Sequence, residues 1–202
     1  AHGREEYTIT WQNGPKVTSQ TGRDLTVEFW ADGEMTYAHT LQGVDHWCKP
    51  TQNWFRDWTV VVDGHSHKLE LKDKAVVIQF DSSSLGDTLS WVEPVKEFRF
   101  KQGLKKVYLA THKNWLFDQD WYRTQGIEFV APGTWPEDAV AVWNVGVYME
   151  DPPGTAWFPN RNKRDWRKIY LGDIASDHLG IGKVERAPRL VYTGKHQQDR
   201  PY

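Results

Sequence analysis

The chain has 202 residues, a net charge of −2, and 39% hydrophobic and 26% charged residues, which predicts a packed globular protein and argues against disorder. This charge also argues against non-specific nucleic-acid binding, and no apolar run approaches the roughly 20 residues that span a bilayer. The N-terminal residues AHGREEYT lack the apolar core of a signal peptide, and the single cysteine, Cys48, can form no internal disulfide. We therefore expect a cytoplasmic protein with no membrane span and no nucleic-acid partner.

Residues 1–72 have the pattern of an antiparallel β domain. Polar and apolar residues alternate over Tyr7–Trp11 and Leu25–Trp30, and Asn13-Gly14 and Asp32-Gly33 are hairpin turn signals. No long helix is indicated here, so we predict a small barrel or sandwich. Two further strands are expected, at Trp58–Val62 and His67–Leu71, with Asp63-Gly64 between them.

The pattern changes near Asp73, where strands begin to alternate with helical segments, and this order is typical of a mostly parallel, Rossmann-like sheet. We place this α/β domain at residues 73–188 and read residues 189–202 as a linker or tail. No GxGxxG or GxxxxGK[ST] motif occurs, so a nucleotide signature is missing. The expected strands are 75–80, 106–110, 127–130 and 140–147, and the expected helices are 88–102, 115–124 and 166–179.

The most informative stretch joins the apolar run Ala75–Phe80 to a small polar loop, 81–86, and then to Asp87 at a helix start. Ligands bind beyond the carboxyl ends of the strands in open α/β sheets, and this pattern delivers one carboxylate to that edge. Asp87 is therefore our candidate general base. A structural alternative is that Asp87 only caps the helix, because aspartate is a favourable N-cap residue.

Other polar groups have weaker claims. His112 and Lys113 follow the second α/β strand, at the same edge, where they could support acceptor binding. His65 and His67 share one strand face, but with no CxxC or HExxH motif we expect solvated histidines and no metal site. We interpret Cys48, beside His46 and Trp47, as a buried structural thiol.

Two further features concern charge and packing. The basic run Arg161, Lys163, Arg164 and Arg167 beside Trp166 is either a solvated helix face or a contact for a nucleotide-sugar phosphate or an acidic partner. The junction at residues 72–74 is too short to let the two domains move freely. We therefore predict that the domains pack against each other, with Trp54, Phe55 or Trp58 in the contact.

The segment SSSLGDTLSWVEPVKEFR, residues 82–99, resembles the S-x-G-D element, followed by a proline, of bacterial heptosyltransferases. The autotransporter O-heptosyltransferases look closer than the lipopolysaccharide enzymes, because they too carry a small β domain before the strand that ends in an LGDT-like loop. The segments KKVYLAT, GIEFVAPG, AVWNVGVYM and IASDHLGI also fit this order. The resemblance implies the N-terminal β domain and first Rossmann-like half of a glycosyltransferase with two Rossmann domains.

The resemblance also implies roles for particular residues. Asp87 would be the base that activates the acceptor hydroxyl. The loop residues before it would shape the loop and its backbone N–H groups. The substrate-binding residues expected on this basis are Ser83, Ser84, Gly86, Thr88, His112 and Lys113.

The reaction implied is transfer of a sugar, heptose, from a nucleotide sugar such as ADP-heptose to serine hydroxyls of a protein. The family's donor-binding groups lie in a second Rossmann half, and its iron-binding cysteine cluster has no counterpart here because only Cys48 exists. We therefore expect no cofactor in this chain. The expected partners are an acceptor protein, a donor domain or second chain, and further copies in a homo-oligomer.

Two other functions stay open at this stage. The chain could be a non-catalytic module that binds a protein or a glycan, because no second Rossmann unit is present. A one-domain hydrolase has less support, since the sequence contains no GxSxG motif and no paired carboxylates within one motif.

Overall fold

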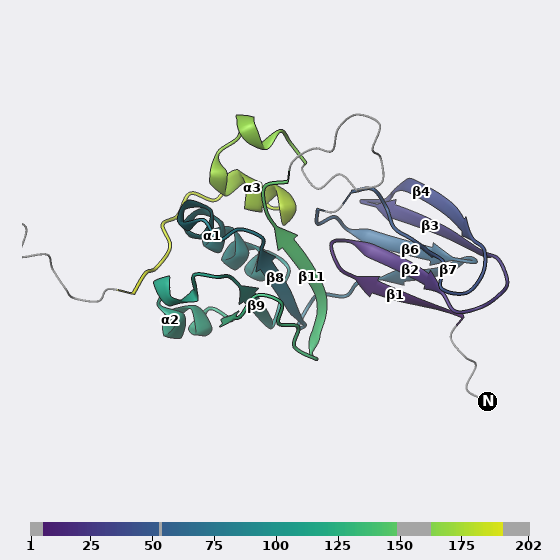
Figure 1. Ribbon diagram of the computed structural model, residues 1–202, viewed down its shortest axis with the longest axis horizontal. Helices are drawn as coiled ribbons and strands as arrows, with labels where there is room; N and C mark the ends of the chain where they lie inside the picture. Colours follow the sequence, from purple (N-terminus) through teal and green to yellow (C-terminus); the bar gives the residue numbers. More distant parts are fainter. Residues whose placement is uncertain (1–5, 53, 149–162, 192–202) are drawn as a thin grey trace, which may run out of the picture.

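The computed structural model describes residues 6–52, 54–148 and 163–191, and it has two parts that lie side by side (Figure 1). The first part contains two antiparallel sheets, and the second contains one parallel sheet with helices. The α/β fold class predicted from the sequence, with an antiparallel β region first, is confirmed. No helix in the described ranges has both the length and the apolar character needed to cross a membrane.

The two antiparallel sheets pack face to face as a sandwich, because alternate residues of their strands meet in one core. In β3, Leu25, Val27 and Phe29 are fully buried, and Val17 of β2 reaches the same core from the other sheet. The sheet orders are β1-β2-β5 and β4-β3-β6-β7. The strands are β1 Tyr7–Trp11, β2 Pro15–Ser19, β3 Leu25–Ala31, β4 Glu34–Leu41, β5 Trp47–Cys48, β6 Trp58–Val62 and β7 His65–Lys68.

Turn chemistry sets the hairpins of the sandwich. Asn13-Gly14, Asp32-Gly33 and Asp63-Gly64 all have positive φ at both residues, at 51° and 88°, 52° and 86°, and 46° and 81°. Two successive residues with positive φ match the type I′ turn, whose twist suits a two-residue hairpin. These turns confirm the hairpin signals that the sequence contains.

Several strand predictions in this part need correction. The strand expected at His67–Leu71 is instead β7, His65–Lys68, because pairing begins directly after the two-residue turn. Leu69 and Leu71 leave the sandwich and pack on the core of the α/β part. The sequence reading missed β2, β4 and β5; seven of the eight residues of β4 are not buried, so it has no apolar alternation to detect.

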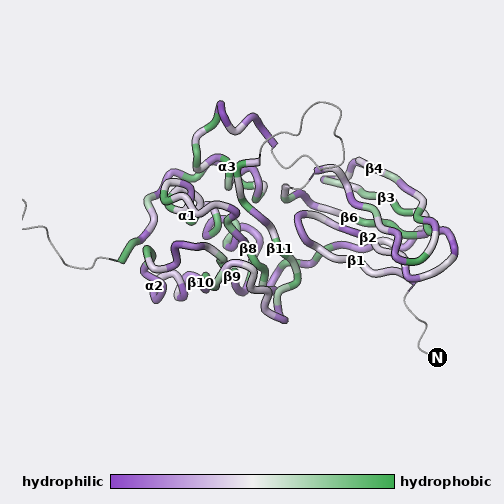
Figure 2. Tube along the Cα trace, in the orientation of Figure 1, coloured by the Kyte–Doolittle hydropathy of each residue, from purple (hydrophilic) through white to green (hydrophobic). Residues whose placement is uncertain are grey.

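The second part is a four-stranded parallel sheet in the order β10-β9-β8-β11. Its central strands are nearly continuous apolar runs, as expected for strands covered on both faces. Figure 2 shows this contrast between apolar strands and polar loops. The strands are β8 Ala75–Phe80, β9 Lys106–Ala110, β10 Ile127–Val130 and β11 Ala139–Val145, and the α-helices are α1 Leu85–Lys101, α2 Gln119–Thr124 and α3 Leu171–His178.

The helices differ from their predicted bounds because of their caps. α1 begins at Leu85, three residues before the expected Thr88, since Ser84 is the N-cap. The expected helix 115–124 divides into a 3₁₀ turn and α2, whose N-cap is Asp118. The expected helix 166–179 likewise divides into a 3₁₀ turn and α3, Leu171–His178. One strand of this part also differs from its predicted bounds: the strand expected at 140–147 is β11, which ends at Val145.

The two parts share a packed seam. The Phe55 ring contacts Phe98 and Trp143 edge-on, with ring centroids 5.0 and 5.4 Å apart, and the Phe55 N–H donates to the His178 carbonyl at 2.8 Å. Trp11 packs against both cores. The prediction of a contact through Phe55 is confirmed.

The domain boundaries at residues 72 and 188 stay predictions. The described residues beyond 188 pair with the chain before α2. The Val191 N–H donates to the Leu116 carbonyl at 2.9 Å, and the Asp118 N–H donates to the Arg189 carbonyl at 3.2 Å. The start of the expected tail therefore follows the α/β surface.

Candidate functional site

The strand order identifies the edge at which a site is expected. β8 comes first along the chain; β9 and β10 extend the sheet on one side, and β11 returns to pair on the other. The order therefore reverses between β8 and β11, and ligands of such sheets bind beyond the carboxyl ends of the strands at this switch point. Residues 81–87 leave β8 at that point.

Asp87 is the third residue of α1 and is half-buried. The Ser82 hydroxyl donates a hydrogen bond to Asp87 Oδ2 at 2.5 Å. The Ser84 hydroxyl accepts from the Asp87 backbone N–H at 3.4 Å and is the N-cap, so the alternative in which Asp87 itself caps the helix is wrong. In the described part of the chain, Ser82 is the hydrogen-bond partner of this carboxylate, and it occupies one oxygen.

The helix start also suits a negative charge. The first turn of a helix carries the positive end of the helix dipole and N–H groups without intrahelical partners. Asp87 lies in that first turn. The Asp87 carboxylate therefore lies at the end of α1 where the helix dipole is positive.

The other predicted loop residues divide into exposed and buried groups. Ser83 and Gly86 are exposed at the loop, as is Ser84. Thr88 is fully buried, and its hydroxyl donates to the Ser84 carbonyl at 2.8 Å, which supports a structural role. A Cβ at Gly86 would lie 3.6 Å from Leu171 Cδ2, an ordinary contact, so packing does not require glycine there.

His112 and Lys113 follow β9, so topology places them at the same carboxyl edge as Asp87. His112 is exposed, and Lys113 is half-buried with its N–H bonded to the Thr111 hydroxyl at 3.3 Å. No hydrogen bond between described residues joins either one to the Asp87 loop. Their role in acceptor binding stays a prediction.

The sequence reading missed a second carboxylate at this edge. Asp81 is the first residue after β8, and its oxygens accept from Asn144 Nδ2 at 2.7 and 2.9 Å and from the Tyr148 hydroxyl at 2.7 Å. Gln79 Nε2 adds a contact at 3.1 Å. The signal was the position of Asp81 directly after an apolar strand, but the pairing of β11 with β8 was needed to reveal its partners.

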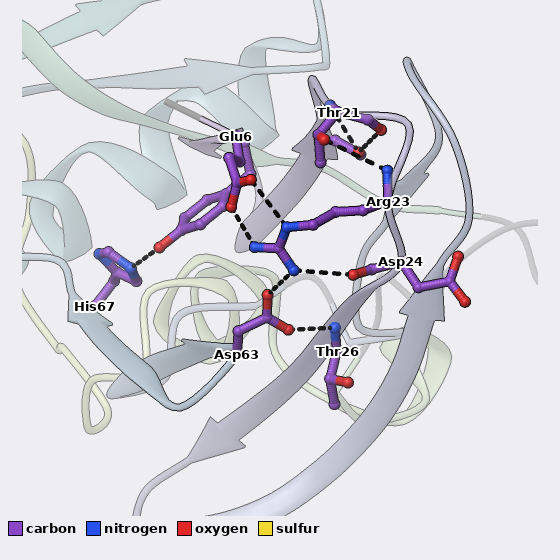
Figure 3. A network of polar contacts seen from close by, with 9 residues as sticks. Glu6, Thr21, Arg23, Asp24, Thr26, Asp63 and His67 are labelled. Atoms are coloured by element: carbon purple, nitrogen blue, oxygen red, sulfur yellow. Dashed lines mark hydrogen bonds and ion pairs between the residues drawn. The ribbon is translucent and has the colours of Figure 1, made fainter. Parts of the chain in front are cut away.

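Of the two histidines in β7, His67 forms a hydrogen bond beside a polar network. His67 shares a 2.7 Å hydrogen bond with the Tyr7 hydroxyl. Nearby, Arg23 forms ion pairs with Glu6 and Asp63, and the Thr26 N–H donates to Asp63 at 2.8 Å (Figure 3). Within the described ranges, no group of three or more His, Cys, Asp or Glu residues could hold a metal ion.

The remaining candidate residues are the basic run near Trp166 and Cys48, and two arginines of the basic run form ion pairs within the chain. Arg164 pairs with Asp177 at 2.7 Å and Arg167 with Asp165 at 2.8 Å, which favours the solvated-face interpretation of the basic run. Arg161 lies outside the described residues, and Lys163 is exposed. Cys48 is buried, as expected, and burial raises the pKa of its thiol to about 12.

The comparisons with known proteins agree with this geometry. Over 135 residues the chain is 25% identical to the autotransporter heptosyltransferase Aah of Escherichia coli. This aligned region covers 66% of the chain and 32% of Aah. The chain resembles the autotransporter heptosyltransferases. That resemblance, first noted in the segment around Asp87, is confirmed, although no family model matches the chain.

Solved structures of TibC show the same fold. The iron-containing dodecameric glycosyltransferase TibC of enterotoxigenic E. coli matches with a TM-score of 0.80 at 21% identity, over 99% of this chain and 52% of TibC. TibC in complex with ADP-D-β-D-heptose matches with a TM-score of 0.78 at 19% identity, over 94% of this chain and 49% of that one. The chain therefore spans about half of TibC and about a third of Aah, which is consistent with an N-terminal half.

Proposed function

We propose that this chain is the acceptor-binding half of a glycosyltransferase that transfers heptose from a nucleotide sugar to serine hydroxyls of a protein, with Asp87 as the general base. The observation that carries the proposal is the position of Asp87. It lies in the first turn of the helix that follows β8, at the point where the strand order reverses. The resemblance to Aah and TibC supports the reaction class.

The chemistry follows from the two oxygens of this carboxylate. Ser82 holds Asp87 Oδ2, which leaves Oδ1 to accept the proton of an acceptor hydroxyl. As the serine oxygen bonds to the anomeric carbon, the bond from that carbon to the donor phosphate breaks, and the nucleoside diphosphate departs with the electron pair. Cationic groups or N–H dipoles are needed to stabilise that leaving group, and we place them in a donor-binding half outside this chain.

The donor, partners and location are part of the same proposal. TibC binds ADP-D-β-D-heptose, which supports a nucleotide sugar as the donor substrate of the complete protein. TibC is dodecameric, which supports a homo-oligomer. Serine-bearing acceptor proteins would meet the enzyme in the cytoplasm.

The alternative is a non-catalytic module that binds a protein or a glycan. The observation that favours it is that residues 1–202 contain no glycine-rich phosphate motif. A module of this kind would bind acceptor proteins but transfer no sugar, even when joined to a donor-binding half.

The test uses a full-length form in which residues 1–202 are joined to the donor-binding half. Asp87→Asn should lower the rate of sugar transfer by about 10²-fold or more, the usual scale for losing a general base. The amide keeps the backbone N–H that Ser84 caps, so the helix start should survive. Transfer is measured by mass spectrometry of the acceptor with a nucleotide heptose.

Asp120→Asn is the matched control, because Asp120 is an exposed aspartate in the first turn of α2. It should transfer sugar at the unaltered rate. Retained activity in Asp87→Asn would remove the general base from the proposal. Acceptor binding without any transfer by the unaltered protein would favour the module.

A further inference from the structure

The β1–β2 hairpin of the sandwich reaches the strand that borders the candidate site. β11 is an edge strand of the parallel sheet, and Gln12 forms a parallel bridge with Val142 on its open side. The Asn13 N–H donates to the Val142 carbonyl at 2.8 Å. The tip of the hairpin is therefore bonded to the backbone of β11 at its middle residue, Val142.

The Asn13 side chain continues this contact to Asn144. Asn13 Oδ1 accepts from the Asn144 backbone N–H at 2.7 Å, and Asn13 Nδ2 donates to Asn144 Oδ1 at 3.2 Å. With its oxygen engaged by Asn13, the Asn144 amide turns its two N–H donors the other way. There, Asn144 Nδ2 lies 2.7 and 2.9 Å from the two oxygens of Asp81.

Asp81 in turn fixes the start of the loop that carries Asp87. The Asp81 N–H donates to the Val145 carbonyl at 2.8 Å, and its carboxylate is surrounded by neutral donors, Asn144 and Tyr148 among them. These hydrogen bonds fix the position of the Asp81 side chain at the start of the loop. The next residue, Ser82, holds Asp87 Oδ2 at 2.5 Å.

We propose that Asn13 is a positioning residue for sugar transfer: through Asn144 and Asp81, the β-sandwich holds the loop that presents Asp87 to the acceptor. This inference rests on the proposed function and adds a catalytic purpose for the sandwich. Loss of a contact that lets a catalytic group move by about 1 Å can lower the reaction rate by up to 10²-fold. The sandwich would raise the rate by preorganising the loop, without touching the substrate through Asn13.

Asn13→Gly is the informative variant. The φ of Asn13 is 51°, a conformation that glycine adopts without steric cost, so this change removes the side-chain hydrogen bonds without adding backbone strain. Asp32→Gly is the matched control. Asp32 has a φ of 52° in the same kind of turn, and its hydrogen bonds to Arg56 and Asp57 stay within the sandwich.

Two measurements are needed. Hydrogen exchange of the chain should show faster exchange at the backbone amides of residues 82–87 in Asn13→Gly, but not in Asp32→Gly. In the full-length enzyme, Asn13→Gly should lower kcat by about 10-fold and leave the KM for the nucleotide sugar unchanged, since the loop and not the donor site is disturbed. Asn13→Asp keeps the acceptor for the Asn144 N–H and should show a smaller loss in both measurements.

The possible outcomes separate the two proposals. Normal exchange in residues 82–87 and a normal kcat in Asn13→Gly, beside an inactive Asp87→Asn, would overturn the positioning role and leave the proposed function standing. Absence of sugar transfer in the unaltered full-length protein would instead overturn the proposed function. If Asn13→Gly fails to fold, Asn13→Asp decides, and wild-type exchange and kcat in that variant overturn the role of Asn13.

Discussion

The two parts of the molecule use their polar residues differently. In the sandwich, asparagine and aspartate occupy the hairpin turns, and the pairs of Arg23 with Glu6 and Asp63 are largely solvent-exposed. In the α/β part, a buried polar pair also joins two helices, α1 and α2. The buried Tyr122 hydroxyl donates to the buried Glu93 carboxylate at 2.8 Å, and burial raises the pKa of Tyr122. Local turn chemistry thus shapes the first part, and long-range packing the second.

This difference explains why the candidate site lies in the α/β part. Antiparallel hairpins join segments that are neighbours in the sequence, so the residues of each turn determine its conformation. A parallel sheet instead brings together the ends of strands that are distant in sequence, as Asp81 after β8 meets Asn144 in β11. The candidate site therefore lies in the α/β part, with the sandwich connected to it through Asn13 and Phe55.

The largest stability effect is expected at the seam that joins the parts. Phe55→Ala removes the edge contacts with Phe98 and Trp143 and should lower the free energy of unfolding by about 2–3 kcal/mol, less than for a fully buried phenylalanine. Phe100→Ala, whose side chain is 76% exposed, should change it by no more than about 0.5 kcal/mol. Urea denaturation measures both; equal stabilities would mean that the parts do not stabilise each other through Phe55.

A second pair of variants compares two buried tryptophans of the α/β core, one with and one without a hydrogen bond from its indole N–H. Trp91 and Trp143 are both buried, but Trp91 Nε1 donates to the Leu171 carbonyl at 2.9 Å, whereas Trp143 Nε1 has no hydrogen-bond partner in the described part of the chain. Replacing each by phenylalanine removes similar volume. Trp91→Phe should therefore be the more destabilising by about 0.5–1.5 kcal/mol, because it loses the hydrogen bond to the Leu171 carbonyl, whereas Trp143→Phe loses none within the described residues. Equal losses in thermal or urea unfolding would contradict this assignment.

The smallest effect concerns the exposed network of the sandwich. The Thr26 N–H and then Arg23 hold the pKa of Asp63 below its ordinary value. Because the folded-state pKa is the lower one, the charge stabilises the fold at neutral pH, and this contribution is lost as the pH falls below about 4 and through the folded-state pKa. Asp63→Asn keeps an acceptor for Thr26 and should cost about 0.5–1 kcal/mol near neutral pH.

Unfolding by urea at a series of pH values measures this difference. The variant and the unaltered chain should converge in stability on acidification. A gap that persists at low pH would show that the carboxylate charge is not what Asp63 contributes.

Sequence patterns predicted the hairpin turns and all four strands of the α/β sheet, with the ends of β11 shifted by one or two residues. They placed Asp87 correctly at the start of a helix after β8, but not the cap, because Ser84 and Asp87 are both favourable near a helix N-terminus. The strand expected at His67–Leu71 was displaced because Leu69 and Leu71 serve the core of the other part. An alternating pattern shows that a residue is buried, but not in which core.

The amino-acid sequence by itself determined the local choices in this protein: the left-handed turns at Asn13, Asp32 and Asp63, the buried parallel strand β8, and the polar loop that ends in Asp87. Each depends on residues that are neighbours in the chain. Only the tertiary structure decided that β11 returns beside β8, and that Asn13 and Asn144 orient the carboxylate of Asp81. These contacts join residues far apart in sequence, and they form when folding buries the apolar residues of each part in a core.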